Sequence, residues 1–137
     1  MHELLFRGQQ RRKGEKVRMD GSPVESSWFY GNGVLQGKGD FSIIYQNEPT
    51  FEKLSVYTDT LGQYTGLADM NGKKIFEGDI VQNIITKETA IVRWYTEHSA
   101  FMLYDKNNNK VYFLYDNNFN NIEIIGNIYD NPELLEV

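Results

Sequence analysis

Residues 62–81, GQYTGLADMNGKKIFEGDIV, decide the fold of this chain because they place two turn signals among strand-forming residues. Asn71-Gly72 is typical of a type I′ turn, whose two central residues need φ > 0, and it predicts a β-hairpin. Gly78-Asp79 predicts a second turn that leads into an apolar strand at Ile80–Ile85. The stretch therefore predicts antiparallel strands joined by tight turns.

The rest of the chain continues this pattern of short apolar runs separated by Gly, Asn and Asp. No window shows a sustained apolar period of 3.6 residues, so the predicted fold class is mainly β. Asn131-Pro132 is typical of a helix start, with Asn131 as the N-cap, and predicts one short C-terminal helical turn. The clearest predicted strands are Phe41–Gln46, Leu54–Thr58, Thr89–Tyr95, Ala100–Tyr104, Lys110–Tyr115 and Ile122–Tyr129.

We expect two parts along the chain. Residues 1–70 form an irregular β-rich N-terminal part, in which Gly-rich loops separate the strands. Residues 71–137 form an SH3-like small barrel, because a Gly-Asp-Ile-Val entry is followed by two hairpins and a closing strand. The alternative is one compact domain made of both parts.

The composition describes a folded chain without cysteine chemistry. Of 137 residues, 40% are hydrophobic and 14% aromatic, which is enough for a core without cross-links. The absence of cysteine excludes disulfides, thiolate catalysis and cysteine-based zinc sites. The N-terminus has no long apolar run, and no stretch approaches the ~20 apolar residues that span a bilayer. We therefore expect a soluble cytoplasmic protein with no membrane partner.

The net charge of −5 is unevenly distributed. Residues 1–20 contain six basic and three acidic side chains, which gives +3 and leaves −8 for the remainder. The acidic remainder repels phosphates at long range, whereas the basic segment Arg7–Arg18 could contact them locally. The alternative is a solvated loop that keeps a β protein soluble. The residues that would contact nucleic acid are Arg7, Arg11, Arg12 and Lys13.

Two acidic motifs could bind a metal ion, and each can also be explained as a structural turn. Asp105-Lys106-Asn107-Asn108-Asn109 matches the first ligands of a calcium loop, but Lys110 stands where that loop needs Gly and Asp116 where it needs Glu. We therefore favour a polar hairpin turn. Glu77 and Asp79 share one face of an extended chain and could hold a cation. We favour a turn capped by Asp79.

The remaining reactive side chains do not form a recognisable catalytic set. His98 lies with Glu97 and Ser99 in a predicted hairpin loop, where adjacent residues rarely meet in triad geometry. The Gly-rich stretch Gly31–Gly37 lacks the spacing of a nucleotide-binding loop. We therefore predict no catalytic, cofactor-binding or metal-ligating residues and no enzymatic activity.

Six aromatic residues of the C-terminal half could form a stacking platform for single-stranded nucleic acid. Such a platform needs a basic groove, and acidic residues outnumber basic ones in this half. We favour core packing for some of these side chains and an exposed surface for protein contact or self-association for others. The six residues are Tyr95, Phe101, Tyr104, Tyr112, Phe113 and Tyr115.

Four sequence blocks together resemble the YopX family of phage and prophage proteins. They are Phe6-Arg7-Gly8, Trp28-Phe29-Tyr30-Gly31, residues 62–81, and residues 122–135, IEIIGNIYDNPELL. The resemblance implies a mainly β protein that is encoded by a bacteriophage or prophage and works in the cytoplasm of a bacterial host. It supplies no catalytic residues, because no activity is established for the family.

Three functions remain open. The leading hypothesis is a non-enzymatic accessory protein that binds another protein or self-assembles. The runner-up is a nucleic-acid-binding small-barrel protein that uses the basic segment Arg7–Arg18. The third is an enzyme that uses Glu77 and Asp79 with a metal.

Overall fold

The structure, a computed structural model, describes residues 3–10, 28–47, 50–114 and 121–136. Its described elements are strands β1 to β12 and short 3-10 turns, so the mainly β fold class is confirmed. None of the helical elements in these ranges is long and apolar enough to cross a membrane.

The chain divides into two compact units, Glu3–Gln63 and Tyr64–Val137, which we call the N-terminal and C-terminal units. Strand β6 (Gly62–Ala68) passes from one to the other, because its first residues pair with β1 and its later residues pair with β7. This boundary lies before the one expected at residue 70. The division into an irregular N-terminal part and a separate C-terminal part, with one compact domain as the alternative, stays a prediction.

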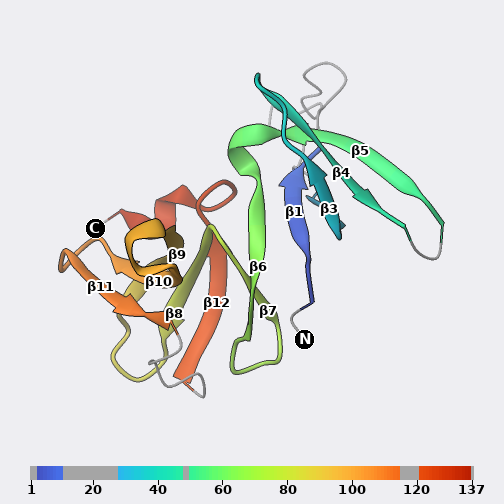
Figure 1. Cartoon of the computed structure of the whole chain (residues 1–137). Coiled ribbons are helices and arrows are strands. Elements are labelled where there is room, and N and C mark those ends of the chain that lie inside the picture. The colour runs from blue at the N-terminus through green and yellow to red at the C-terminus, as the bar shows by residue number, and fades with distance from the viewer. Residues whose placement is uncertain (1–2, 11–27, 48–49, 115–120, 137) are drawn as a thin grey trace, which may run out of the picture. The chain divides into compact units, whose positions relative to one another are not determined.

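The described strands of the N-terminal unit form two antiparallel groups. One joins β2 to β1 and β1 to the start of β6; the other has the order β3-β4-β5, with the long β4–β5 hairpin visible in Figure 1. Ile44 of β4 and Val56 of β5 are fully buried and form its apolar centre. The elements are β1 (Phe6–Gln9), β2 (Trp28–Gly31), β3 (Gly33–Leu35), β4 (Phe41–Gln46), β5 (Glu52–Tyr57) and the 3-10 turn η1 (Thr58–Thr60).

The C-terminal unit is built on a five-stranded antiparallel sheet of order β11-β10-β9-β8-β12 (Figure 1). The last strand of the unit returns to pair with β8. Side chains from one face of this sheet form the core with Ile75 and Leu114; they are Val81, Val92, Leu103 and Ile122. The elements are β7 (Lys74–Phe76), β8 (Asp79–Asn83), β9 (Thr89–Tyr95), η2 (Thr96–His98), β10 (Ala100–Asp105), β11 (Lys110–Phe113), β12 (Ile122–Asn127) and η5 (Pro132–Leu135).

The predicted SH3-like barrel is not confirmed, because the sheet does not close. Its order ends at β11 and β12, and no ladder joins these two strands among the described residues. Strand β11 is short, with four residues of which three are exposed. Strand β12 contacts a different partner, the tip of the β6–β7 hairpin.

That hairpin forms where Asn71-Gly72 predicts it, but the predicted type I′ turn is wrong. Of these two residues only Gly72 has a positive φ, +79°. Gly72 N donates to Asp69 O at 3.0 Å, and Asp69 N donates to Lys73 O at 2.8 Å. This is the pattern of a three-residue loop, a type I turn followed by a left-handed residue. The loop is one residue longer than expected, so only its last residue needs φ > 0.

Asp69 fastens the hairpin to β12. Its side chain is only 7% exposed, and Oδ1 accepts two N–H groups of its own turn at 2.9 Å. Oδ2 accepts the Ile124 N–H at 2.9 Å, 55 residues along the chain. Beside it, Met70 N donates to Ile122 O at 2.9 Å. These contacts cover part of a sheet edge that would otherwise expose unpaired backbone groups.

The predicted C-terminal helical turn is present as η5, with Pro132 at its start. The expected capping by Asn131 is wrong, since its side chain makes no cap hydrogen bond. Instead, Asn131 Oδ1 accepts the Asn127 N–H at 3.2 Å. A Cβ at Gly126 would lie 2.6 Å from that oxygen, so glycine lets the turn pack back onto β12.

Candidate functional site

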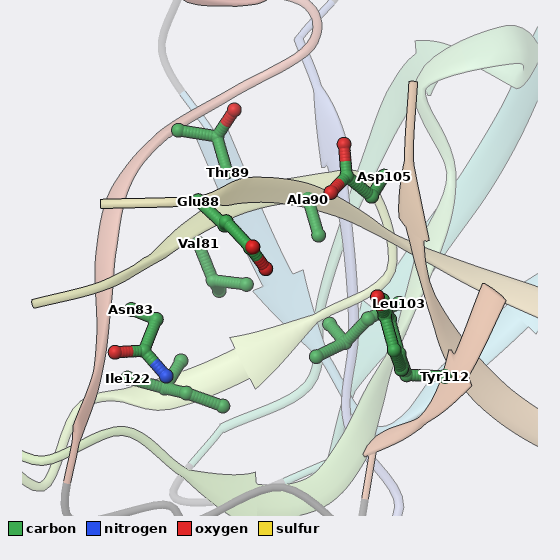
Figure 2. Close-up of a pocket in the computed structure, with 9 residues that line it drawn as sticks. All are labelled: Val81, Asn83, Glu88, Thr89, Ala90, Leu103, Asp105, Tyr112 and Ile122. Carbon is green, nitrogen blue, oxygen red and sulfur yellow. The ribbon is translucent and has the colours of Figure 1, made fainter. Parts of the chain in front are cut away.

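A pocket of about 120 Å³ opens on the core face of the five-stranded sheet, within the C-terminal unit (Figure 2). The pairing register explains its composition, because directly paired residues share one face of a sheet. Val81 pairs with Ala90, Leu103 with Tyr112, and Ile122 with Asn83. The residues that line the pocket are Val81, Asn83, Glu88, Thr89, Ala90, Leu103, Asp105, Tyr112 and Ile122.

The floor of the pocket is apolar and its rim is polar. Val81, Leu103 and Ile122 belong to the buried core and are at most 4% exposed. Figure 2 shows the Glu88 carboxylate directed toward the middle of the pocket, with Leu103 and Tyr112 on the opposite side. The pocket is therefore an extension of the core that reaches solvent through acidic and hydroxyl groups.

Several rim groups have no partner within the described part of the chain. The Glu88 carboxylate and the Tyr112 hydroxyl make no hydrogen bond or ion pair there. Asn83 Oδ1 accepts the N–H groups of the next turn at 2.9 and 3.2 Å, which leaves its Nδ2 as a donor. Unused polar groups beside an apolar floor are typical of a recognition site.

Asp105 is the second acidic residue of the pocket, and it is 2% exposed. Its Oδ1 accepts the N–H groups of Asn107 and Asn108 at 3.0 and 3.2 Å, and its Oδ2 accepts Asn108 Nδ2 at 2.8 Å. The polar hairpin turn predicted from residues 105–109 is confirmed, because it joins β10 to β11. Asp116, the last position of the calcium-loop pattern, lies outside the described residues.

Asp79 caps a turn, as predicted. Its Oδ2 accepts the Phe76 N–H at 2.7 Å, and Gly78 between them has φ +93°. Neither Glu77 nor Asp79 lines the pocket. In the described ranges, no three His, Asp or Glu side chains come close enough together to hold a metal ion.

His98 lies in the exposed turn η2, which confirms the loop position predicted for it. Its ring makes an edge contact with Phe113 at 5.7 Å between centroids. Ser99 directs its hydroxyl to Thr96 O at 3.5 Å. His98 and Ser99 therefore make contacts that stabilise the turn.

The aromatic residues considered for a stacking platform do not share one face of the sheet. Phe101 pairs with Trp94, and their rings contact edge to face at 5.0 Å on the core side. Tyr104 lies on the other face, because side chains alternate along a strand and Tyr104 is three residues from Phe101. There the Arg93 guanidinium stacks 4.7 Å from the Tyr104 ring. Tyr115 lies outside the described residues. The split agrees with packing roles for some of these side chains and exposure for others.

The basic residues considered for nucleic-acid contact are only partly described. Arg7 is 6% exposed, and its guanidinium stacks 4.6 Å from the Trp28 ring. In this position Arg7 does not face solvent, where a phosphate would approach. Arg11, Arg12 and Lys13 lie outside the described residues, and nucleic-acid binding through them stays a prediction.

Two of the sequence blocks pair directly with each other. In the register of β1 and β2, Phe6 faces Gly31 and Gly8 faces Phe29. A Cβ at Gly8 would lie 2.8 Å from Val56, and one at Gly31 would lie 2.5 Å from the Tyr45 carbonyl oxygen. These glycines allow close packing, so both blocks serve the fold of the N-terminal unit.

Sequence reasoning missed the pocket, because its residues come from five strands and the β8–β9 turn. Glu88 and Thr89 immediately follow a turn in which Lys87 has φ +65°. No local motif marks Glu88, whereas Asp105 stood out through its Asn-rich turn. A signal was present only in the alternation of Ala90, Val92 and Trp94, which identifies the face on which the pocket lies.

Comparisons with known proteins identify a family and a similar solved structure. A family model described as YopX protein matches residues 16–136. No curated protein matches the chain. The crystal structure of protein EF1440 from Enterococcus faecalis is similar over 97% of this chain and 98% of that one, with 23% sequence identity and a TM-score of 0.40.

Proposed function

Because the chain belongs to the YopX family, we propose that it is a phage- or prophage-encoded accessory protein that acts by binding another protein. It works without enzymatic chemistry, in the cytoplasm of the bacterial host. The observation that supports protein binding is the pocket on the core face of the five-stranded sheet.

The size of the pocket favours a protein partner over a free metabolite. Small-molecule sites usually measure about 300–1,000 Å³. At about 120 Å³, this pocket accepts one side chain. Protein interfaces commonly place a central side chain in such a desolvated pocket and surround it with weaker contacts.

The surroundings of the pocket supply a contact surface. Strand β11 is an edge of the sheet, and its Val111 and Tyr112 are 41% and 38% exposed. Because adjacent residues of a strand face opposite sides, Tyr112 flanks the pocket and Val111 faces away from it. A partner at this edge therefore meets aromatic surface, backbone groups that pair with no described strand, and the pocket together.

Site-directed photo-crosslinking in host cells tests this function. A photoreactive residue in place of Lys110, on β11 beside the pocket, should give a discrete covalent adduct. The matched control replaces Leu35 of β3, which is 63% exposed in the other unit and should give none. An adduct of twice the chain mass identifies a second copy as the partner. No discrete adduct at Lys110, with a strict monomer by light scattering, would contradict protein binding.

A further inference from the structure

The chemistry of the pocket identifies the kind of side chain that enters it. We propose that the pocket receives a lysine side chain of the partner protein, an inference that rests on the proposed function and specifies its central contact. The pocket combines an apolar floor with an acidic rim, and lysine combines an apolar stem with a cationic end.

The volume fits lysine. A cavity of about 150 Å³ in a protein core holds a benzene molecule. A pocket of about 120 Å³ is of the same order and open to solvent, so it has room for the four-carbon stem of lysine with the compact ammonium at the rim. The planar guanidinium of arginine is broader than the ammonium and needs a wider rim to form its paired hydrogen bonds.

The floor suits the methylene stem. Val81, Ala90, Leu103 and Ile122 present only apolar side chains. The four methylene groups of a lysine stem would cover this surface, and their removal from water favours binding. A short polar side chain would leave this surface uncovered.

The rim suits an ammonium group, which donates three hydrogen bonds and accepts none. The Glu88 carboxylate and the Tyr112 hydroxyl are acceptors without partners among the described residues. Two lysines of the chain lie near the pocket: Lys87 precedes Glu88 in the sequence, and Lys110 pairs with Asp105 across the strands. Neither lysine forms an ion pair with Glu88 within the described ranges. The Glu88 charge is therefore available to a cation from outside.

Asp105 contributes to lysine binding through its negative charge more than through a direct hydrogen bond to the ammonium. Its oxygens are already hydrogen-bonded to the turn, so they are held in one place by Asn107 and Asn108. A buried carboxylate that cannot turn away favours a cation nearby and opposes an anion. Asn83 Nδ2 adds one donor at the same rim, which suits a main-chain carbonyl of the partner beside the inserted side chain.

Titration of the full-length protein with n-butylammonium chloride, followed in ¹H–¹⁵N NMR spectra, tests the inference. This ion has the carbon chain and charge of a lysine side chain. We expect saturable shifts of the Ala90, Leu103 and Ile122 amides. The neutral isostere n-butanol should bind at least about tenfold more weakly, and butyrate should not bind, because the ammonium makes charge-assisted hydrogen bonds at the rim.

Variants locate the contact. Glu88→Gln should weaken n-butylammonium binding at least about fivefold and leave n-butanol binding unchanged, since it removes the charge and keeps the shape. Glu88 is exposed, so this change leaves the core intact. The control is Glu97→Gln, an exposed carboxylate in η2 that does not line the pocket, and it should leave both affinities unchanged.

Each other outcome overturns the inference in a distinguishable way. If n-butanol binds as well as n-butylammonium, the pocket accepts an apolar side chain, and protein binding stands without the lysine. If neither probe shifts the pocket amides, the pocket is not a binding site. The Lys110 crosslinking experiment then decides independently whether the chain binds a protein.

Discussion

Replacing Asp69 by alanine should destabilise the C-terminal unit and leave the N-terminal unit unaffected. The carboxylate accepts three backbone N–H groups at 2.9 Å. The two donors in its own turn can bond to water instead, at about 1 kcal/mol each, whereas the Ile124 N–H loses its partner at about 2 kcal/mol. The expected loss is about 4 kcal/mol, or a urea midpoint about 2 M lower at an m-value of about 2 kcal/mol/M.

Two tryptophans allow the units to be measured separately. Trp94 lies in the C-terminal unit and Trp28 in the N-terminal unit, so their indole N–H signals in NMR spectra follow each unit during urea unfolding. Asp69→Asn should cost about half as much as the alanine change, because one amide oxygen keeps part of the bonding. The control is Glu123→Gln on β12, whose side chain makes an exposed contact of 3.4 Å to Asn71. A loss below about 1 kcal/mol, or an equal shift of both indole signals, would refute the fastening role.

Three further substitutions test single features by urea unfolding. Gly31→Ala should lower the free energy of unfolding by about 2 kcal/mol or more, because the added Cβ would lie 2.5 Å from the Tyr45 carbonyl oxygen. The control is Gly39→Ala, which has nothing within 4 Å of the added Cβ and should change this free energy by less than about 1 kcal/mol. Gly72→Ala should cost about 1 kcal/mol, because φ is +79° with open space around it; no loss would mean that the turn relaxes to another form. Asp79→Ala should cost about 2 kcal/mol by leaving a buried amide at the end of β7 without its acceptor, and an unchanged midpoint would contradict the capping role.

Local sequence patterns predicted the strands well. The alternation in Thr89–Tyr95 and the predicted start at Lys110 correspond to β9 and β11, since period-two alternation reflects a sheet with two different faces. The turn of residues 105–109 was predictable because Asp and Asn bond to backbone groups two or three residues away. Such interactions are contained in a short window of sequence.

Features that depend on distant residues were not predictable. The Asp69 carboxylate bonds to Ile124, 55 residues away, and no local signal distinguishes it from an ordinary turn residue. The turn type of the β6–β7 hairpin was predicted wrongly because Asn-Gly occurs in both two-residue and three-residue loops. The pairing register of the two flanking strands decides which loop forms. The pocket depends on five strands being in register, so its acidic rim emerged only in three dimensions.

The contact between the β6–β7 hairpin and β12 makes the two edges of the five-stranded sheet different. Met70 and Asp69 occupy backbone groups on the β12 side, while β11 has no second neighbouring strand in the described part of the chain. If two copies join by pairing their β11 strands, each uses an edge that no described strand covers, and the hairpin leaves fewer free backbone groups on β12 for a third copy. Association by this route favours a two-fold dimer over a fibre.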